Sequence, residues 1–302
     1  MKQPLMTKWW NADYSSLLDF TNEDAVKWYF NQRQVLVNLG VASFKYDGGE
    51  ANFLTNNFAT NITINDPNFY STAYANAAYS NTNKYIEVRV GYMTQHLPIF
   101  VRIMKMRSLW SGNRGLNVLI PSVLHFGLIG YPFVLPDIIG GTKRPSRELF
   151  IRWTQINAFL PSMQFSILPW TYDQEVVDLC RNLVDLHVNY VTPLIIKWGK
   201  VSVVSGDPII RPLWWVAPND KRTYNDSTTF LIGEDVLVAP IVSKGQTHRD
   251  IYLPRGTWKD MMLNKIIQGP ITLRDYSIPL KNIAYFEKVK PIKLQRLNKS
   301  YF

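Results

Sequence analysis

A helical pattern that leads directly into a buried strand is the feature that most limits how this chain can fold. Residues 19–40 have helical spacing, with Thr21 or Asn22 as the N-cap and Gly40 as a stop signal. "VASFKY", residues 41–46, follows at once and has the apolar, β-rich composition of a core strand. Because a helix that passes directly into a buried strand is typical of a parallel sheet, we predict an α/β architecture.

This predicted strand ends in a carboxylate. Asp47 follows it directly, and Gly48 and Gly49 come next. One interpretation is a simple turn, because Asp and Gly favour turns. The alternative is a site in an α/β barrel, where functional side chains gather at the carboxyl ends of the strands. "YPFVLPDIIGG" repeats the pattern with Asp137, for which a turn before the next helix is the competing interpretation.

Further elements alternate in the same way up to about residue 227. A loop rich in Asn, Thr, Ser and Tyr is expected to pass into a helix within 51–83, as in loops that build a pocket. The other predicted elements are a strand at 85–93, helices at 115–130, 146–163 and 173–202, and a last strand at 208–215. Residues 228–302 contain short strands separated by Gly, Pro and Asp turns, which predict an all-β C-terminal domain with a basic tail.

Charge and cysteine content exclude several classes of function. The chain carries 33 Lys and Arg against 23 Asp and Glu, but the basic residues are scattered and match no nucleic-acid motif. No apolar run is long enough to span a membrane, so we expect no membrane anchor in this chain. Cys180 is the only cysteine and lies in a helical pattern, which predicts a core thiol and excludes an internal disulfide. We predict neither a metal nor a cofactor.

Six ordered segments resemble glycoside hydrolase family 31, and most closely its myogenesis-regulating branch. They span residues 5 to about 288 and are "WWNADYSSLLDFTN", "FKYDGGE", "GYPFVLPDIIGG", "RWTQINAFLPSMQFS", "PIIRPLWW" and "FLIGEDVLVAPIV". The resemblance implies the later part of a (β/α)8 TIM barrel over 1–227, followed by a C-terminal antiparallel β-sandwich domain over 228–302. It also implies that the first barrel strands and an N-terminal sandwich belong to a longer chain or come from elsewhere.

The family's chemistry is retaining hydrolysis of α-glycosides, and the branch suggests α-galactosides. This mechanism uses two carboxylates about 5–5.5 Å apart, one as nucleophile and one as acid and then base. By the resemblance, Asp47 is the nucleophile and Glu50 supports its loop. The two glycines after Asp47 let the chain turn beside the sugar without a side chain in the way.

The resemblance also implies a set of sugar-binding residues, so the expected partner is a carbohydrate. Trp10 matches an aromatic that lines the sugar site, although a core tryptophan is the alternative. Arg89 matches an arginine that grips sugar hydroxyls, and Asp137 matches an aspartate of the pocket. Phe165 and Ser166 lie in a segment that carries subsite residues in relatives. That segment lacks the "RNH" ending of the α-glucosidases, so glucosidase specificity is not implied.

One motif departs from the family pattern. The family's acid/base lies in D-x-x-S-x-W, but here the segment is "KMRSLW", so Lys105 occupies the Asp position. The chain has no carboxylate between Glu87 and Asp137, and we therefore predict impaired hydrolysis. Asp137 as a substitute acid is one alternative. A catalytically inactive homologue with a glycan-binding, structural or regulatory role is another.

Three N-x-S/T sequons, at Asn61, Asn225 and Asn298, are consistent with passage through the secretory pathway or a lumen of the endoplasmic-reticulum type. The family resemblance gives the same expectation. Nothing in the sequence determines the oligomeric state.

Overall fold

The structure, a computed structural model, describes residues 4–10, 12–83 and 85–289. The basic tail beyond residue 289 and the sequon at Asn298 lie outside the described residues. Contacts divide the chain into two compact units. The first unit contains the chain up to Met104 together with Phe126–Asp137, and the second contains Lys105–His125 and the chain from Ile138 onward.

Four short parallel strands form the sheet of the first unit, which confirms the predicted α/β class. Their order in the sheet is β3-β4-β5-β6, and each neighbouring pair is parallel. Their bounds are β3 (Phe44–Tyr46), β4 (Ile86–Val88), β5 (Phe100–Arg102) and β6 (Val134–Leu135). Because the strands run the same way, their carboxyl ends meet at one edge of the sheet.

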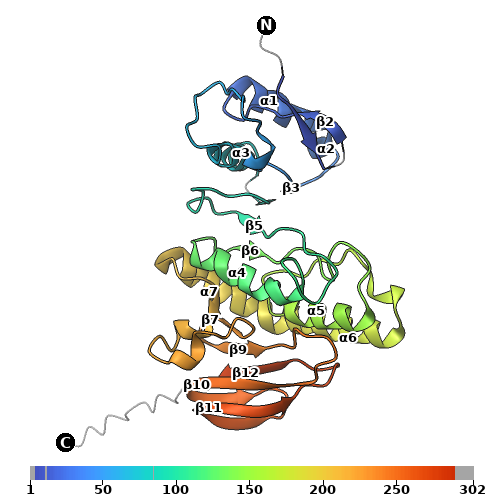
Figure 1. Ribbon diagram of the computed structural model, residues 1–302, viewed down its shortest axis with the longest axis vertical. Helices are drawn as coiled ribbons and strands as arrows, with labels where there is room; N and C mark the ends of the chain where they lie inside the picture. Colours follow the sequence, from blue (N-terminus) through green and yellow to red (C-terminus); the bar gives the residue numbers. More distant parts are fainter. Residues whose placement is uncertain (1–3, 11, 84, 290–302) are drawn as a thin grey trace, which may run out of the picture. The chain divides into compact units, whose positions relative to one another are not determined.

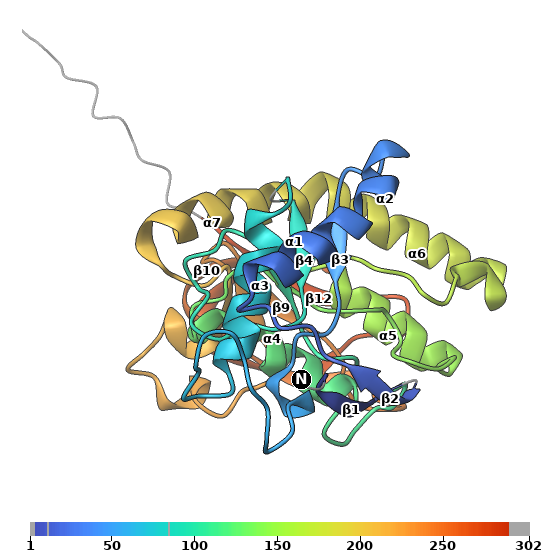
Figure 2. The same ribbon diagram turned by 90° about the horizontal axis from the view of Figure 1, so that it is seen from above.

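Helices cover one face of this sheet. Helix α1 (Glu23–Gln32) begins at Asn22, whose side chain accepts a hydrogen bond from the backbone N–H of Asp24 at 2.9 Å, as an N-cap should. Figure 2 shows α1 and α3 beside strands β3 and β4. The other elements of this unit are α2 (Gln34–Asn38), the 3₁₀ turn η1 (Ala51–Phe53), α3 (Phe69–Ser80) and a hairpin of β1 (Met6–Trp9) and β2 (Ala12–Ser16). The hairpin was not predicted.

The core of the first unit lies between these helices and the strands. It is rich in tyrosine and phenylalanine, because helix α3 presents aromatic and alanine side chains to the sheet. Its buried members include Phe30, Tyr46, Tyr74, Val88 and Val101. This apolar layer holds the strands in place, so the opposite face of the sheet is left for polar groups.

The second unit has a helical layer and an antiparallel sheet (Figure 1). Ser146 caps α5, and its side chain accepts a hydrogen bond from the N–H of Leu149 at 3.4 Å; Asp173 caps α6 in the same way. A five-residue π-helical segment, η4, joins α6 to α7 in one continuous rod. The bounds are η2 (Leu116–Val118), α4 (Leu119–Leu128, whose end belongs to the first unit), α5 (Arg147–Asn157), η3 (Pro169–Thr171), α6 (Gln174–Leu186), η4 (His187–Val191) and α7 (Thr192–Ser205).

Six antiparallel strands form the C-terminal sheet, in the order β11-β10-β12-β9-β8-β7. Strands across 234–255 confirm the predicted β-domain there. Two 3₁₀ turns, η5 (Leu213–Trp215) and η6 (Lys221–Thr223), lie in the connection between β7 and β8. The bounds are β7 (Ile210–Pro212), β8 (Phe230–Ile232), β9 (Val236–Ala239), β10 (His248–Asp260), β11 (Lys265–Ser277) and β12 (Ala284–Lys288).

One sequence-based assignment needs correction. Residues 208–215 were expected to be the last strand of the αβ part, but β7 pairs antiparallel with β8, and Ile210 lies opposite Ile232. The chain returns from β7 to β8 without an α-helical crossover, and a parallel pair needs such a crossover. The domain boundary at 227/228 itself stays a prediction.

A buried arginine links helix α5 to the connection between strands β11 and β12 of the C-terminal sheet. Arg152 is 1% exposed, and its guanidinium donates to the carbonyls of Ile278 at 2.9 Å and Asn282 at 3.0 Å. Burial lowers the pKa of Arg152 to about 10. Within the described part of the chain, every helix is too short or too polar to cross a bilayer.

Candidate active site

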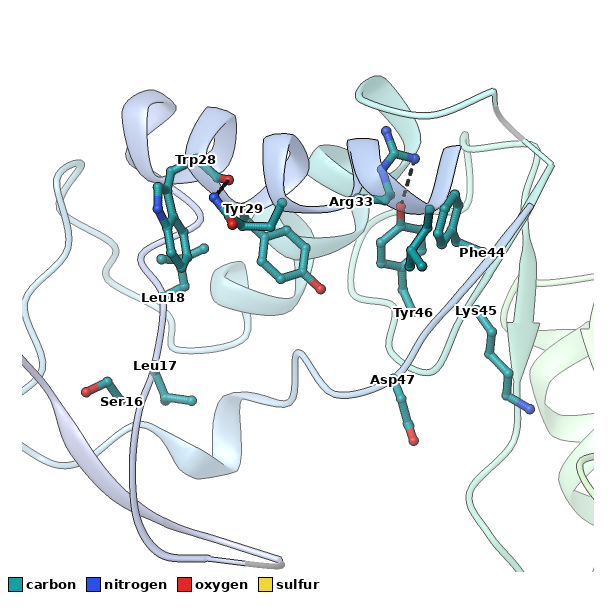
Figure 3. A pocket seen from close by; sticks show the side chains of 12 residues that line it. Ser16, Leu17, Leu18, Trp28, Tyr29, Arg33, Phe44, Lys45, Tyr46 and Asp47 are labelled. Atoms are coloured by element: carbon teal, nitrogen blue, oxygen red, sulfur yellow. Dashed lines mark hydrogen bonds between the residues drawn. The ribbon is translucent and has the colours of Figure 1, made fainter. Parts of the chain in front are cut away.

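Strand β3 separates apolar and charged side chains onto opposite faces, as the two-residue period of a strand requires. Phe44 and Tyr46 face helix α1, where Arg33 lies 4.8 Å from the Phe44 ring centroid and donates to the Tyr46 hydroxyl at 3.3 Å. Burial raises the pKa of Tyr46 to about 12. Figure 3 shows Lys45 and Asp47 extending away from α1, on the other side of the strand.

The neighbouring strands continue this charged layer because the parallel register places equivalent positions side by side. Lys45 lies beside Glu87 of β4, and its Nζ is 3.2 Å from Glu87 Oε1. Arg89 follows β4, Arg102 ends β5, and Asp137 follows β6. The edge of the sheet where these strands end therefore carries a row of charges.

Asp47 is the meeting point of two arginines. Its Oδ1 accepts a hydrogen bond from Arg89 Nη1 at 2.9 Å and another from Arg102 Nη2 at 2.9 Å. Its side chain is 36% exposed, whereas that of Arg89 is 10% exposed. The carboxylate therefore reaches solvent while two cations hold it from the protein side, which is a charge-assisted arrangement.

Arg102 joins three carboxylates from three different strands. Besides the bond to Asp47, its Nε donates to Glu87 Oε1 at 2.9 Å and its Nη1 donates to Asp137 Oδ1 at 3.1 Å. Its side chain is 1% exposed. A buried guanidinium has a high desolvation cost unless hydrogen-bonded partners compensate for it, and these three carboxylates supply that compensation.

Helix α3 supports the turn that carries Asp47. The Tyr74 hydroxyl donates to the backbone carbonyl of Asp47 at 3.0 Å, and Ser71 Oγ donates to the carbonyl of Gly49 at 2.8 Å. Burial raises the pKa of Tyr74, so its hydroxyl keeps the proton that it donates. Gly48 and Gly49 have φ values of +94° and +85°, which favour glycine.

Trp10 and Glu50 both contact Arg89. The Arg89 guanidinium carbon lies 4.8 Å from the Trp10 ring centroid, and its Nη2 forms an ion pair with Glu50 Oε1. Trp10 is 45% exposed, so it lies outside the buried core. Its ring also contacts Trp9, with the ring centroids 4.2 Å apart. These contacts bring the predicted residues Trp10, Glu50 and Arg89 into one group with Asp47.

Three of the remaining predicted residues, Lys105, Phe165 and Ser166, belong to the second unit. Lys105 is exposed and follows β5 in a segment that is neither helix nor strand. Phe165 is half-buried and forms an isolated parallel bridge with Ile139, and Ser166 is exposed. The roles of all three stay predictions. Asp137 of the first unit, predicted to line the pocket, is 2% exposed and accepts a hydrogen bond from Arg102, and its pocket role stays a prediction.

A largely apolar cavity of about 710 Å³ runs along β3 and ends at Asp47 (Figure 3). Its walls come from α1, α2, β3 and the segment after β2, and they include Leu17, Trp28, Tyr29, Leu36 and Phe44. Of the charged residues at the strand ends, Asp47 is the one that lines this cavity. The described residues contain no group of three or more His, Cys, Asp or Glu side chains arranged to hold a metal ion.

Sequence reasoning missed Arg102 and the strand that ends in it. Within residues 101–107, only Lys105 was predicted to have a role. A usable signal was present, because "PIFVRI" has strand composition and places Arg102 at a strand end, as "FKYD" places Asp47. Glu87, the second carboxylate on Arg102, was missed as a functional residue too.

Comparison of the sequence with models of protein families shows the family of this chain. The model of the glycosyl hydrolases family 31 TIM-barrel domain matches residues 1–194, and the model of the family 31 C-terminal domain matches residues 206–291. The chain belongs to glycoside hydrolase family 31. The parallel sheet is therefore a fragment of the family 31 TIM barrel, and the antiparallel sheet is its C-terminal domain.

Two relatives are similar over nearly the whole chain. Myogenesis-regulating glycosidase from Mus musculus is 39% identical over 296 residues, which cover 94% of this chain and 41% of that protein. SITS-binding protein from Tetronarce californica is 36% identical over 302 residues, covering 95% of this chain and 42% of the relative. This family 31 chain thus spans about two fifths of the length of these relatives.

Solved family 31 structures have the same fold. A Flavobacterium johnsoniae dextranase complexed with glucose superposes with a TM-score of 0.82 at 24% identity, over 95% of this chain and 39% of the dextranase. A sulfoquinovosidase from E. rectale gives a TM-score of 0.84 at 20% identity, over 96% and 46% of the two chains. At these identities the likeness concerns the fold alone.

Proposed function

We propose that this chain performs the retaining chemistry of family 31 on α-glycosides, with Asp47 as the nucleophile. The observation that carries the proposal is the setting of Asp47: a partly exposed carboxylate at a strand end, held by Arg89 and Arg102. Two positive-φ glycines then turn the chain away from it. A nucleophile needs this combination of access and fixed direction.

In the first step an Asp47 oxygen attacks the anomeric carbon. The bond from that carbon to the leaving-group oxygen breaks, and the leaving group departs with the electron pair. A glycosyl ester on Asp47 is the product, and water later cleaves it. Arg89, placed between Asp47, Glu50 and Trp10, is suited to hold a sugar hydroxyl beside the reacting carbon.

Lys105 limits which leaving groups can depart. An alkyl or sugar oxygen needs a proton as the bond breaks, and the ammonium of Lys105 replaces the carboxylic acid that the family uses there. General acid–base catalysis contributes about 10²–10⁴-fold. We therefore expect turnover of natural-type α-glycosides to be weaker by about that factor, while an activated aryl glycoside still forms the glycosyl ester.

The proposed substrate is a carbohydrate with an α-linked terminal sugar, for which α-galactosides are the first choice. Trp10 is 45% exposed, and its ring is suited to contact the apolar side of a pyranose. Phe165 and Ser166 are proposed subsite residues. The dextranase and sulfoquinovosidase among the similar structures act on different sugars, so the family fold does not by itself select one.

A second candidate function is glycan binding without turnover. The sequence feature that favours it is Lys105, which stands where the family resemblance implies the acid/base; without that carboxylate, no base activates water to release the glycosyl ester. Under this candidate, Trp10 and Arg89 keep a sugar-binding role and Asp47 serves as a hydrogen-bond acceptor for sugar hydroxyls.

Hydrolysis of α-galactosides with graded leaving groups separates the two candidates. The parent chain, Lys105→Asp and Asp47→Asn are assayed with a dinitrophenyl glycoside, a methyl glycoside and a disaccharide. We expect the parent to release one equivalent of dinitrophenol and then to slow, because release of the ester lacks a base. Lys105→Asp should raise disaccharide turnover by up to about 10²–10⁴-fold.

The controls give each outcome a meaning. Asp47→Asn should abolish the burst, and a burst that survives this change refutes Asp47 as the nucleophile. Rapid disaccharide turnover by the parent would show that another residue supplies the proton. Sugar binding by calorimetry without any burst, in the parent and in Lys105→Asp, supports the glycan-binding candidate.

A further inference from the structure

Behind Asp47, the guanidinium of Arg102 joins two further carboxylates, Glu87 and Asp137, which take no part in the proposed reaction. Arg102 is 1% exposed, and three of its nitrogens donate to carboxylates of Asp47, Glu87 and Asp137 at 2.9, 2.9 and 3.1 Å. With its fork filled in this way, the guanidinium plane is fixed by Glu87 and Asp137. Its remaining contact, to Asp47, therefore has a fixed direction.

Asp137 is buried behind this guanidinium. Its side chain is 1% exposed, and its Oδ1 accepts from Arg102. Its Oδ2 is inaccessible to solvent and has no hydrogen-bond partner among the described residues. A sugar hydroxyl cannot reach an oxygen that is closed to water, so contact with substrate does not explain this carboxylate. Asp137 also has a φ of +62°, a backbone conformation that residues other than glycine rarely adopt.

We infer that Arg102 and Asp137 are positioning residues for Asp47, and that Asp137 acts through Arg102 rather than by binding sugar. This inference rests on the proposed nucleophilic role of Asp47. The strained backbone of Asp137 then has an explanation, because it directs the carboxylate toward Nη1 of Arg102. Arg102 then holds Oδ1 of Asp47 in the direction from which the carboxylate attacks.

Covalent trapping measures the positioning without requiring the missing acid. In a 5-fluoro-α-galactosyl fluoride, an Asp47 oxygen bonds to the anomeric carbon while the carbon–fluorine bond breaks and fluoride leaves with the electron pair. The fluorine at carbon 5 slows hydrolysis of the ester, so the protein mass increases by one fluoroglycosyl group. The maximal labelling rate reports positioning, and the concentration giving half that rate reports binding.

Arg102→Met should lower the maximal labelling rate by about 10²-fold with little change in the half-saturating concentration, because misplaced reacting groups cost about that much. Arg102→Lys should recover part of the rate, since it keeps the charge but loses the fork. Asp137→Asn should lower the rate less and have no additional effect in the Arg102→Met background.

Arg211→Met is the matched control. Arg211 is also 1% exposed and forms ion pairs with Asp207 and Glu234, but it belongs to the second unit. Its replacement should leave the labelling rate unchanged. If Asp137→Asn raises the half-saturating concentration, and does so equally in the Arg102→Met background, Asp137 binds sugar and the inference is wrong. An unchanged rate in folded Arg102→Met also overturns it.

A measurement without sugar separates this inference from the proposed function. If the parent is not labelled, the proposed nucleophilic role fails, and the ¹⁵N signals of the Arg102 side chain then test the contacts alone. Asp47→Asn and Asp137→Asn should each shift those signals, and Arg211→Met should not. Absence of a shift in either of the first two variants refutes the arrangement. Circular dichroism verifies the fold of every variant, and the near-isosteric Asp137→Asn keeps the test valid if Arg102→Met does not fold.

Discussion

Gly49 is the position where a single methyl group should be most costly. It has a φ of +85°, and a Cβ built there would lie 2.5 Å from Cδ1 of the Tyr74 ring. That ring cannot easily withdraw, because its hydroxyl donates to the Asp47 carbonyl and the ring packs against Phe20 in a T-shaped pair, with the ring centroids 4.9 Å apart. Gly49→Ala therefore combines backbone strain with a steric clash.

Gly40 provides the comparison needed to separate these two costs. Its φ is +93°, nearly the same conformation, but nothing lies within 4 Å of the Cβ position. Gly40→Ala should lower the free energy of unfolding by about 1–2 kcal/mol through the left-handed backbone alone. Gly49→Ala should lose that amount and a further ~1–3 kcal/mol from overpacking.

Urea unfolding followed by far-ultraviolet circular dichroism gives both free energies. Covalent labelling of Asp47 adds a functional readout, which Gly49→Ala should slow and Gly40→Ala should leave unchanged. Equal losses of stability in the two variants would refute the reasoning, because the Tyr74 contact would then cost nothing. In the Tyr74→Ala background, Gly49→Ala should cost less than it does alone, since the clash has been removed.

Two further predictions concern single hydrogen-bonding groups. Tyr74→Phe should cost about 0.5–1.5 kcal/mol of stability and slow the labelling of Asp47. Tyr70→Phe, which loses a bond to the Leu18 carbonyl, should cost a similar amount and leave the labelling rate unchanged. Equal labelling rates in the two variants would contradict a role for Tyr74 at the site. Asp173 accepts from Arg147 and from the N–H of Val176, and these bonds lower its pKa to about 2 from 3.8. Its stabilising effect should therefore be complete above about pH 4 and disappear as the pH falls through 2. The free energy of unfolding of Asp173→Asn should vary less with pH over that interval than that of the parent. Parallel curves of unfolding free energy against pH for parent and variant would show that the cap is not linked to protonation.

The sequence was sufficient to locate strand ends but not the contacts behind them. Asp47, Arg89 and Asp137 could be found because each follows a stretch of strand composition, and side chains at the ends of parallel strands converge. The burial of the Asp137 side chain was not predictable, because it depends on the position of Arg102, which contacts it. Arg102 was missed because β5 has only three residues and no helix separates it from β4, so the alternation of strands and helices used to find the other strands fails there. The antiparallel pairing of β7 was missed for a similar reason, since a three-residue strand does not reveal which sheet it joins.

The guanidinium of Arg102 also has a consequence for how this unit folds. Its three carboxylate partners are 55, 15 and 35 positions away along the chain, so no single hairpin or helix can bring them together. Until β3, β4, β5 and β6 have all assembled, Arg102 is better solvated by water than by a partly formed set of partners. Closing the charged layer is therefore a late and cooperative event, and contacts of this range slow folding. The apolar helix-facing core should form first, and the geometry around Asp47 should be the last part of the unit to reach its native form.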